Sequence, residues 1–283
     1  MPALPGVTHR TVDVSGLAVH VAEAGPPDAP PLVLLHGWPQ HWWSWRRVVP
    51  LLAEDFRLVL PDLRGHGWSA VPAGGYDKEQ LATDLLGLLD ALELPRVQLV
   101  GHDWGGWTGF LACLRAPERF SSYLALSIPH PFQRADARLL QLWRAAYQVP
   151  LATPLLGRGL LQRVPAAVER LIEAGSSVPG TFTPEDLRAY SLVLQEPARA
   201  RASTLLYRTF LLHEAAPVWA GRYRPEDLQV RTRLVAGEDD LVVTPALLAG
   251  WDGDVTLLPG VGHFLPEEAP QVVADAVRDL AGA

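Results

Sequence analysis

Residues 98–106 read QLVGHDWGG and place Asp103 between small residues, directly after a strand and directly before a helix. This is the arrangement of a nucleophile elbow, a strained turn that lifts one reactive side chain out of the edge of a sheet. Gly101 and Gly105 leave room for the strand and the helix to approach without colliding side chains. We therefore predict that Asp103 points into a pocket. An ordinary turn aspartate is the alternative, which the flanking strand and helix disfavour.

The segments before this turn read as strands separated by helices. Alternating residues over 11–22 indicate an entering hairpin, and short β-rich apolar runs follow at 32–35, 58–60 and 97–100. A helix is predicted over about 78–92, because its leucines recur at three- and four-residue steps. Those leucines are expected in the core: Leu81, Leu85, Leu88, Leu89 and Leu92.

The segments after the turn first break this rhythm and then resume it. A strand near residues 123–128 is followed by helical character that runs to about Arg222. Strand-like residues 234–236 and 255–258 and a terminal helix around 270–280 then restore the earlier pattern.

The alternation of strands and helices predicts an α/β fold, with a mostly parallel twisted sheet flanked by helices. With 283 residues, 48% of them hydrophobic, the chain can bury a large core. We predict that residues 1–130 and 223–283 form this core domain and that residues 131–222 form an inserted helical cap.

An aspartate at the elbow limits the chemistry. Attack by a carboxylate on an ester would give a labile anhydride, whereas attack on a saturated electrophilic carbon gives an alkyl ester that water can later cleave. Asp103 therefore favours epoxides and alkyl halides over esters as substrates.

The loop after the strand at 32–35 is the expected source of an oxyanion hole. It reads His36-Gly-Trp38-Pro39, and the backbone amides of Trp38 and Trp104 are the predicted donors. Proline at position 39 fixes its own φ, which would help to hold the Trp38 amide in place. A simple strand-ending turn is the alternative.

The remaining two members of a catalytic triad follow in chain order. Asp240 is predicted to orient the histidine, with Asp239 in the same acidic turn as the alternative. His263, in a glycine-rich loop after the next strand, is the predicted base. His36 and His102 are expected to be structural.

The composition excludes several classes of partner. A formal net charge of -7 argues against nucleic acid, because phosphate backbones require a basic face. The single cysteine, Cys113, can form neither an internal disulfide nor a thiolate cluster, and no cofactor or metal is expected. The N-terminal residues lack the pattern of a leader and no run reaches the ~18 apolar residues of a spanning helix, so we expect a cytoplasmic monomer or homodimer with no membrane partner.

These motifs together resemble the epoxide hydrolases of the α/β-hydrolase fold. The resemblance covers the whole chain and is densest in HGWPQHWWSW (36–45), PDLRGHGWS (61–69), GHDWGG (101–106), GEDD (237–240) and PGVGHF (259–264). It implies an α/β-hydrolase fold, a small apolar epoxide and water as reactants, and a vicinal diol as product. Gln40 departs from the glutamate that is frequent in the family, which leaves the mechanism intact but bears on substrate preference.

The resemblance also implies two cap tyrosines that donate hydrogen bonds to the epoxide oxygen. Tyr147 and Tyr207 match those positions, and Tyr190 and Tyr223 are the alternatives. Such donors are needed because an alkoxide leaves poorly unless it is protonated or strongly hydrogen-bonded.

Two other functions remain open at this point. Haloalkane dehalogenases resemble the same HDWG turn and use the same ester chemistry, with the Trp104 indole and a second donor such as Trp38 holding the halide. A ligand-binding receptor on this fold is the other possibility, and the presence of all three triad members disfavours it.

Overall fold

The computed structural model describes residues 1–133 and 146–282, and within them the chain forms an eight-stranded sheet in the order β1-β2-β4-β3-β5-β6-β7-β8. The first two strands form an antiparallel hairpin, β2 also pairs antiparallel with β4, and every later pairing is parallel. The predicted entering hairpin and mostly parallel sheet are therefore confirmed. The strands are β1 (Thr8–Val14), β2 (Leu17–Ala24), β3 (Pro31–Leu35), β4 (Arg57–Pro61), β5 (Val97–His102), β6 (Phe120–Leu126), β7 (Thr232–Gly237) and β8 (Asp254–Leu258).

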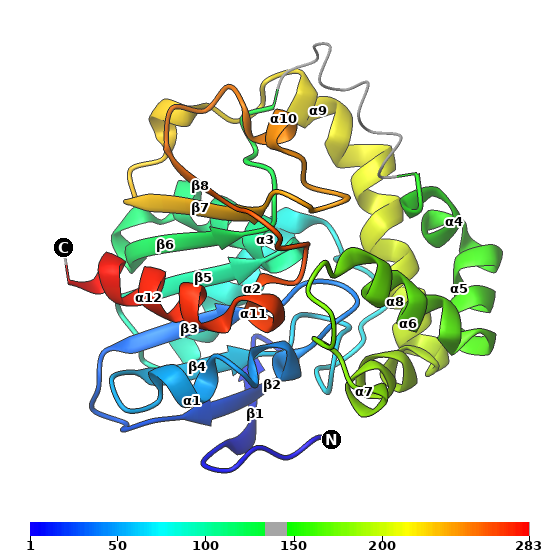
Figure 1. Cartoon of the computed structure of the whole chain (residues 1–283), viewed down its shortest axis with the longest axis horizontal. Coiled ribbons are helices and arrows are strands. Elements are labelled where there is room, and N and C mark those ends of the chain that lie inside the picture. Colours follow the sequence, from blue (N-terminus) through cyan, green and yellow to red (C-terminus); the bar gives the residue numbers. More distant parts are fainter. Residues whose placement is uncertain (134–145, 283) are drawn as a thin grey trace.

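Helices cover both faces of the sheet (Figure 1). On one face lie α2 (Lys78–Ala91) and α3 (Trp104–Arg115), and on the other lie α1 (Val49–Leu52) and α12 (Pro270–Ala281). The predicted leucine face of α2 is buried in the core. Trp42 and Trp45 belong to the short helix η1 (Trp42–Trp45) and are fully buried with α1 and α12, so they pack against the sheet.

A helical insertion lies between β6 and β7, to the right of the sheet in Figure 1. Its described helices fall within residues 131–222, for which a cap was predicted, and residues 134–145 of that range lie outside the described residues. Across the described chain, every helix is too short or too polar to span a bilayer. The elements of the insertion are α4 (Gln148–Ala152), α5 (Pro154–Arg163), α6 (Pro165–Gly175), α7 (Pro184–Leu194), α8 (Pro197–Thr209), the π-helix η4 (Phe210–Glu214) and α9 (Ala215–Trp219).

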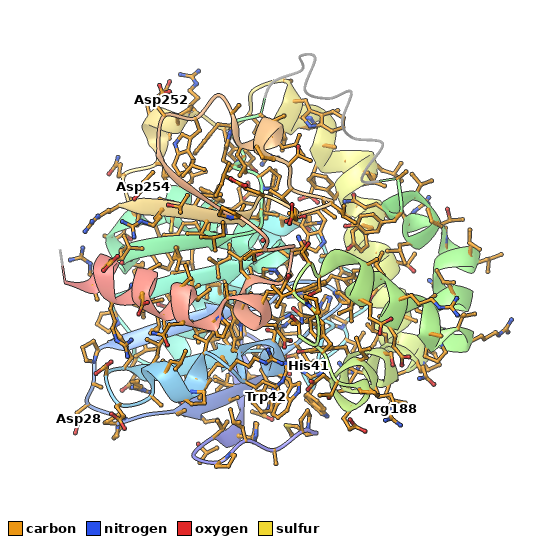
Figure 2. The ribbon with its side chains drawn as sticks, viewed as in Figure 1. Asp28, His41, Trp42, Arg188, Asp252 and Asp254 are labelled. Carbon is orange, nitrogen blue, oxygen red and sulfur yellow. The ribbon has the colours of Figure 1, made fainter. Side chains whose placement is uncertain are left out.

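Buried charges join the insertion to the sheet domain. The guanidinium of Arg46 pairs with Asp186 of α7 at 2.9 Å and with Glu267 of α11 (Leu265–Glu268). Nearby, His41 Nε2 donates to the Ala189 carbonyl of α7 at 3.1 Å. Figure 2 labels His41 in this crowded region and Arg188 at the outer side of α7. The insertion is thus fastened to the loop that follows β3.

Helix α3 approaches β3 more closely than a side chain would permit. A Cβ atom placed on Gly105 would lie 2.3 Å from the His36 carbonyl oxygen and 2.6 Å from that of Leu35. Both neighbours are backbone atoms, which cannot move without shifting the sheet. Glycine at position 105 therefore sets the distance between α3 and β3.

We predict that Gly105→Ala lowers the free energy of unfolding by about 1–3 kcal/mol, because the added methyl group overpacks rigid backbone. Urea denaturation measures the change. Gly159→Ala is the matched control, since a Cβ atom there meets nothing within 4 Å. In α5 that substitution should leave stability unchanged or raise it by up to about 1 kcal/mol. Equal effects of the two substitutions would contradict the account.

Candidate active site

Asp103 occupies the turn between β5 and α3 in a strained backbone conformation. Its φ is 51° and its ψ is -124°, values that non-glycine residues rarely adopt. The turn is compact because a Cβ atom on Gly101 would lie 2.5 Å from the Gly105 carbonyl oxygen. The arrangement is that of a nucleophile elbow, with the Asp103 side chain only 10% exposed.

One oxygen of the Asp103 carboxylate sits in the predicted oxyanion hole. The backbone N–H of Trp38 donates to Asp103 Oδ1 at 2.8 Å. Burial opposes ionisation of this carboxyl, but hydrogen bonding and positive charge from His263, with help from the Trp104 amide, lower the pKa of Asp103. The carboxylate is therefore ionised at neutral pH, as a nucleophile must be.

The second carboxylate oxygen faces the histidine. His263 Nε2 lies 3.7 Å from Asp103 Oδ2, and His263 Nδ1 lies 2.8 Å from Asp240 Oδ2. The other oxygen of Asp240 accepts the backbone N–H groups of Val242 at 2.7 Å and Val243 at 2.9 Å. The structure thus brings Asp240 to the histidine, whereas Asp239 is exposed.

The two carboxylates control the charge of the imidazole. Burial alone would lower the pKa of His263, but the charge of Asp240 and the hydrogen bond to Asp103 raise it to about 10. At neutral pH the histidine is therefore a cation between two anions.

Tyr207 and Tyr147 stand beside this triad. Tyr207, buried on α8, packs edge-on against the rings of Trp38 and Trp104 at centroid distances of 5.2 and 5.7 Å. Tyr147 immediately precedes α4, and its ring centroid lies 6.2 Å from that of Tyr207. Burial and the negative charge of Asp103 raise the pKa of both phenols, so they keep their protons at neutral pH.

The two alternative tyrosines are engaged elsewhere. The Tyr190 hydroxyl donates to Glu267 in the buried charge cluster around Arg46. The Tyr223 hydroxyl donates to Glu79 Oε1 at 2.7 Å. Tyr147 lines both cavities beside the triad, whereas Tyr207, Tyr190 and Tyr223 line neither, so Tyr207 is linked to the site through its ring contacts with Trp38, Trp104 and Tyr147.

Two mainly apolar cavities flank the triad. A cavity of about 310 Å³ is bordered by Asp103, Trp104 and Tyr147, and one of about 240 Å³ by Trp38, Tyr147 and His263. The predicted nucleophile and the predicted base therefore both border partly enclosed space suited to a small apolar molecule. Within the part of the chain that the structure describes, no cluster of side chains is arranged to hold a metal ion.

The two remaining site histidines have structural hydrogen bonds. His36 Nε2 accepts the Leu63 backbone N–H at 3.0 Å, and His102 Nε2 donates to the His263 carbonyl at 2.8 Å. Burial lowers the pKa of His36 to about 3 and that of His102 to about 4, so both rings are neutral.

Glu268 is a site residue that sequence reasoning missed. Its carboxylate accepts the backbone N–H groups of Gly262 and Phe264, both at 2.9 Å, and so fixes the loop on both sides of His263. It also accepts the Ser177 N–H of the insertion at 2.8 Å. Its place five residues after His263 was the only available signal.

The α/β hydrolase fold family model matches residues 30–270. The chain is similar to the soluble epoxide hydrolase of Corynebacterium sp. (strain C12), with 29% identity over 95% of each chain. It is also similar to epoxide hydrolase 3 of Siraitia grosvenorii, with 28% identity over 97% of this chain and 98% of the relative. Among solved structures, the epoxide hydrolase CorEH without ligand superposes with a TM-score of 0.86 and 28% identity, over 98% of this chain and 99% of that one.

The raised pKa of His263 predicts how stability depends on pH. A folded pKa of about 10 against an ordinary value of 6.5 gives stability that is fully present below about pH 6.5 and is lost as pH rises through 10. Urea denaturation of the wild type and of His263→Gln should show a stability difference that shrinks over this range. Other groups titrate in both proteins, so the difference isolates His263. A difference that stays constant or grows would contradict the ion-pair assignment.

Proposed function

The chain belongs to the α/β-hydrolase fold family, and we propose that it is an epoxide hydrolase that forms an ester on Asp103 and releases a vicinal diol. The observation that carries the proposal is the state of the Asp103 carboxylate. One oxygen is held by the Trp38 N–H at 2.8 Å, and Asp103 borders a mainly apolar cavity that the protonated Tyr147 also lines, with the protonated Tyr207 packed next to Tyr147. The names of the similar proteins support the same reaction.

In the first step, Asp103 Oδ2 attacks an epoxide carbon and the carbon–oxygen bond of the ring breaks. The electron pair goes to the departing oxygen, which receives a hydrogen bond and a proton from Tyr207 or Tyr147. Because burial raises the pKa of both phenols, they are protonated at this step and can donate. An ester of Asp103 with a hydroxyalkyl group results.

Ester formation removes the negative charge of Asp103, and this change converts His263 into the base that the second step needs. Esterification removes one of the two anions that raise the pKa of His263, so the imidazolium releases its proton. That proton replaces the one that a tyrosine gave to the alkoxide, so the tyrosine becomes a neutral phenol again. The neutral His263, oriented by Asp240, can then act as a base.

In the second step, His263 takes a proton from water, and the hydroxide adds to the ester carbonyl carbon. The charge that develops on Oδ1 is received by the N–H groups of Trp38 and Trp104. Collapse of this intermediate breaks the ester bond, and the diol leaves with the proton held by His263. Asp103 is left as a carboxylic acid, which gives its proton to neutral His263, and this transfer regenerates the Asp103 carboxylate and the His263 cation of the resting site.

The substrate is a small apolar epoxide, and residues 131–222 act as the cap that encloses it. Side chains of the helical insertion, including Tyr147 and Phe210, border the cavity beside Asp103. Apolar walls exclude bulk water, which strengthens the hydrogen bonds made to the departing oxygen.

Halide release from a haloalkane is a second candidate function, because one observation favours it. The buried indole N–H groups of Trp38 and Trp104 make no hydrogen bond among the described residues. Such donors could hold a leaving halide.

We predict that a panel of epoxides and 1-haloalkanes yields diol from an epoxide and no halide, since both phenolic donors stand beside Asp103. Product analysis by chromatography and halide titration measures the two outcomes, with Asp103→Ala as the inactive control. Halide release without diol formation would decide for the dehalogenase.

We predict that His263→Ala accumulates protein heavier by the mass of one epoxide molecule, because ester formation proceeds and hydrolysis does not. Intact-protein mass spectrometry after mixing with an epoxide that the wild type accepts measures the adduct. The double variant Asp103→Asn with His263→Ala is the control and should remain unmodified. An adduct of equal yield in the control would place the reaction on another residue.

A further inference from the structure

The only lysine of the chain, Lys78, is fully buried at the start of α2, next to the proposed active site. Neither the triad nor the oxyanion hole uses it. Burying an ammonium group costs desolvation free energy, which only well-placed hydrogen-bond and ion-pair partners can offset. The partners of Lys78 therefore indicate what it does.

On one side the ammonium holds the helical insertion. Lys78 Nζ donates to the Leu206 carbonyl at 2.6 Å and pairs with Glu214 Oε2 at 3.1 Å. The other oxygen of Glu214 accepts the Lys78 backbone N–H at 2.8 Å. These contacts enclose the junction of α8 with the π-helix η4, and Leu206 is the residue directly before Tyr207.

On the other side the ammonium contacts the elbow. Lys78 Nζ lies 4.5 Å from the ring centroid of Trp104 and 5.3 Å from that of Phe210. Both contacts are cation–π interactions, which are strongest for a desolvated cation over tryptophan. Trp104 follows the nucleophile directly, and its indole packs against Tyr207. The Lys78 ammonium thus contacts both Trp104 of the elbow and the backbone carbonyl of Leu206, the residue before Tyr207.

The π-helix η4 follows Tyr207 in the chain and ends at Glu214, the ion-pair partner of Lys78. A single π-turn shifts the register of a helix and is frequent at functional sites. Here η4 begins at Phe210, three residues after Tyr207, and its last residue is Glu214, the partner of Lys78. Burial lowers the pKa of Lys78 to about 8, opposed mainly by Glu214, so the ammonium is still charged at pH 7.

We propose that Lys78 is a positioning residue for ring opening, which sets Tyr207 at the correct distance from the elbow by binding the Leu206 carbonyl, Glu214 and the Trp104 ring together. The inference rests on the proposed epoxide hydrolysis. Lys78 acts through Tyr207 and does not touch the substrate. If it served stability alone, its removal would act independently of the Tyr207 hydroxyl.

A double-mutant cycle between Lys78→Met and Tyr207→Phe tests this. The measured quantity is the rate of ester formation at pH 7, followed by quenched-flow mass spectrometry in a His263→Ala background, where the ester persists. Lys78→Met should slow ester formation about 10- to 100-fold when Tyr207 is present, because small displacements of a donor have effects of that size. In the Tyr207→Phe background, where Tyr147 still donates, Lys78→Met should slow ester formation less than about twofold.

Arg46→Met is the matched control, since Arg46 is a second buried cation that joins the insertion to the sheet domain, and its ion pairs are with Asp186 and Glu267. Its effect on the rate should be the same in both Tyr207 backgrounds. If Lys78→Met does not fold, Glu214→Gln runs the same cycle, because it loosens the same ammonium and leaves it in place.

Equal slowing by the Lys78 or Glu214 substitution in both Tyr207 backgrounds would overturn the inference, as would no slowing at all. These outcomes are separate from failure of the proposed function. If the parent His263→Ala protein forms no ester with any epoxide, the reaction itself is wrong. If it forms the ester and the cycle is additive, only the role of Lys78 is wrong.

Discussion

The close approach of α3 to β3 is the constraint from which the site follows. Because no side chain fits between Gly105 and the carbonyl groups of Leu35 and His36, the helix starts directly above the loop that ends β3. That position places the Trp38 N–H at 2.8 Å from Asp103 Oδ1. The strained backbone of Asp103 persists because strand, helix and this hydrogen bond all hold it. The nucleophile is therefore in place before any substrate enters, which reduces the reorganisation that the reaction requires.

Buried charge is the second theme of the structure. Asp103, Asp240 and His263 form a chain of alternating charges, in which the histidine cation stabilises both carboxylates. Away from the triad, Arg46 and Lys78 each join the sheet domain to the helical insertion, Arg46 through the buried Asp186 and Glu267 and Lys78 through the partly exposed Glu214. Such pairs add little net stability but penalise displaced arrangements strongly, so they specify one position of the insertion over the site.

The sequence allowed the fold and most of the proposed site to be predicted, because both depend on local patterns. The elbow at Asp103 and the loop of His263 each lie between a strand and a helix, where glycine and apolar periodicity are informative. The choice between Asp239 and Asp240 could not be made from the turn itself. It depends on the Val242 and Val243 N–H groups that hold Asp240 toward His263.

Contacts between segments far apart in the chain could not be predicted, because they leave no local pattern in the sequence. Lys78 and Glu214 are 136 residues apart, and Arg46 and Glu267 are further apart still. A lone lysine at a helix start ordinarily predicts a solvated side chain, and the π-helix that brings Glu214 to Lys78 has no sequence signature. These contacts were therefore missed, although Lys78 lies against both the Trp104 ring of the predicted elbow and the Leu206 carbonyl next to the predicted tyrosine.

The central claim is that the Asp103 carboxylate, and not water, forms the new bond to carbon. A single turnover in H₂¹⁸O with enzyme in excess over epoxide tests it directly, by mass spectrometry of the diol and of the peptide that contains Asp103. The account predicts an unlabelled diol and one ¹⁸O atom in the Asp103 carboxylate, because water attacks the ester carbonyl carbon. A diol that carries ¹⁸O after the first turnover, with an unlabelled Asp103, would contradict it.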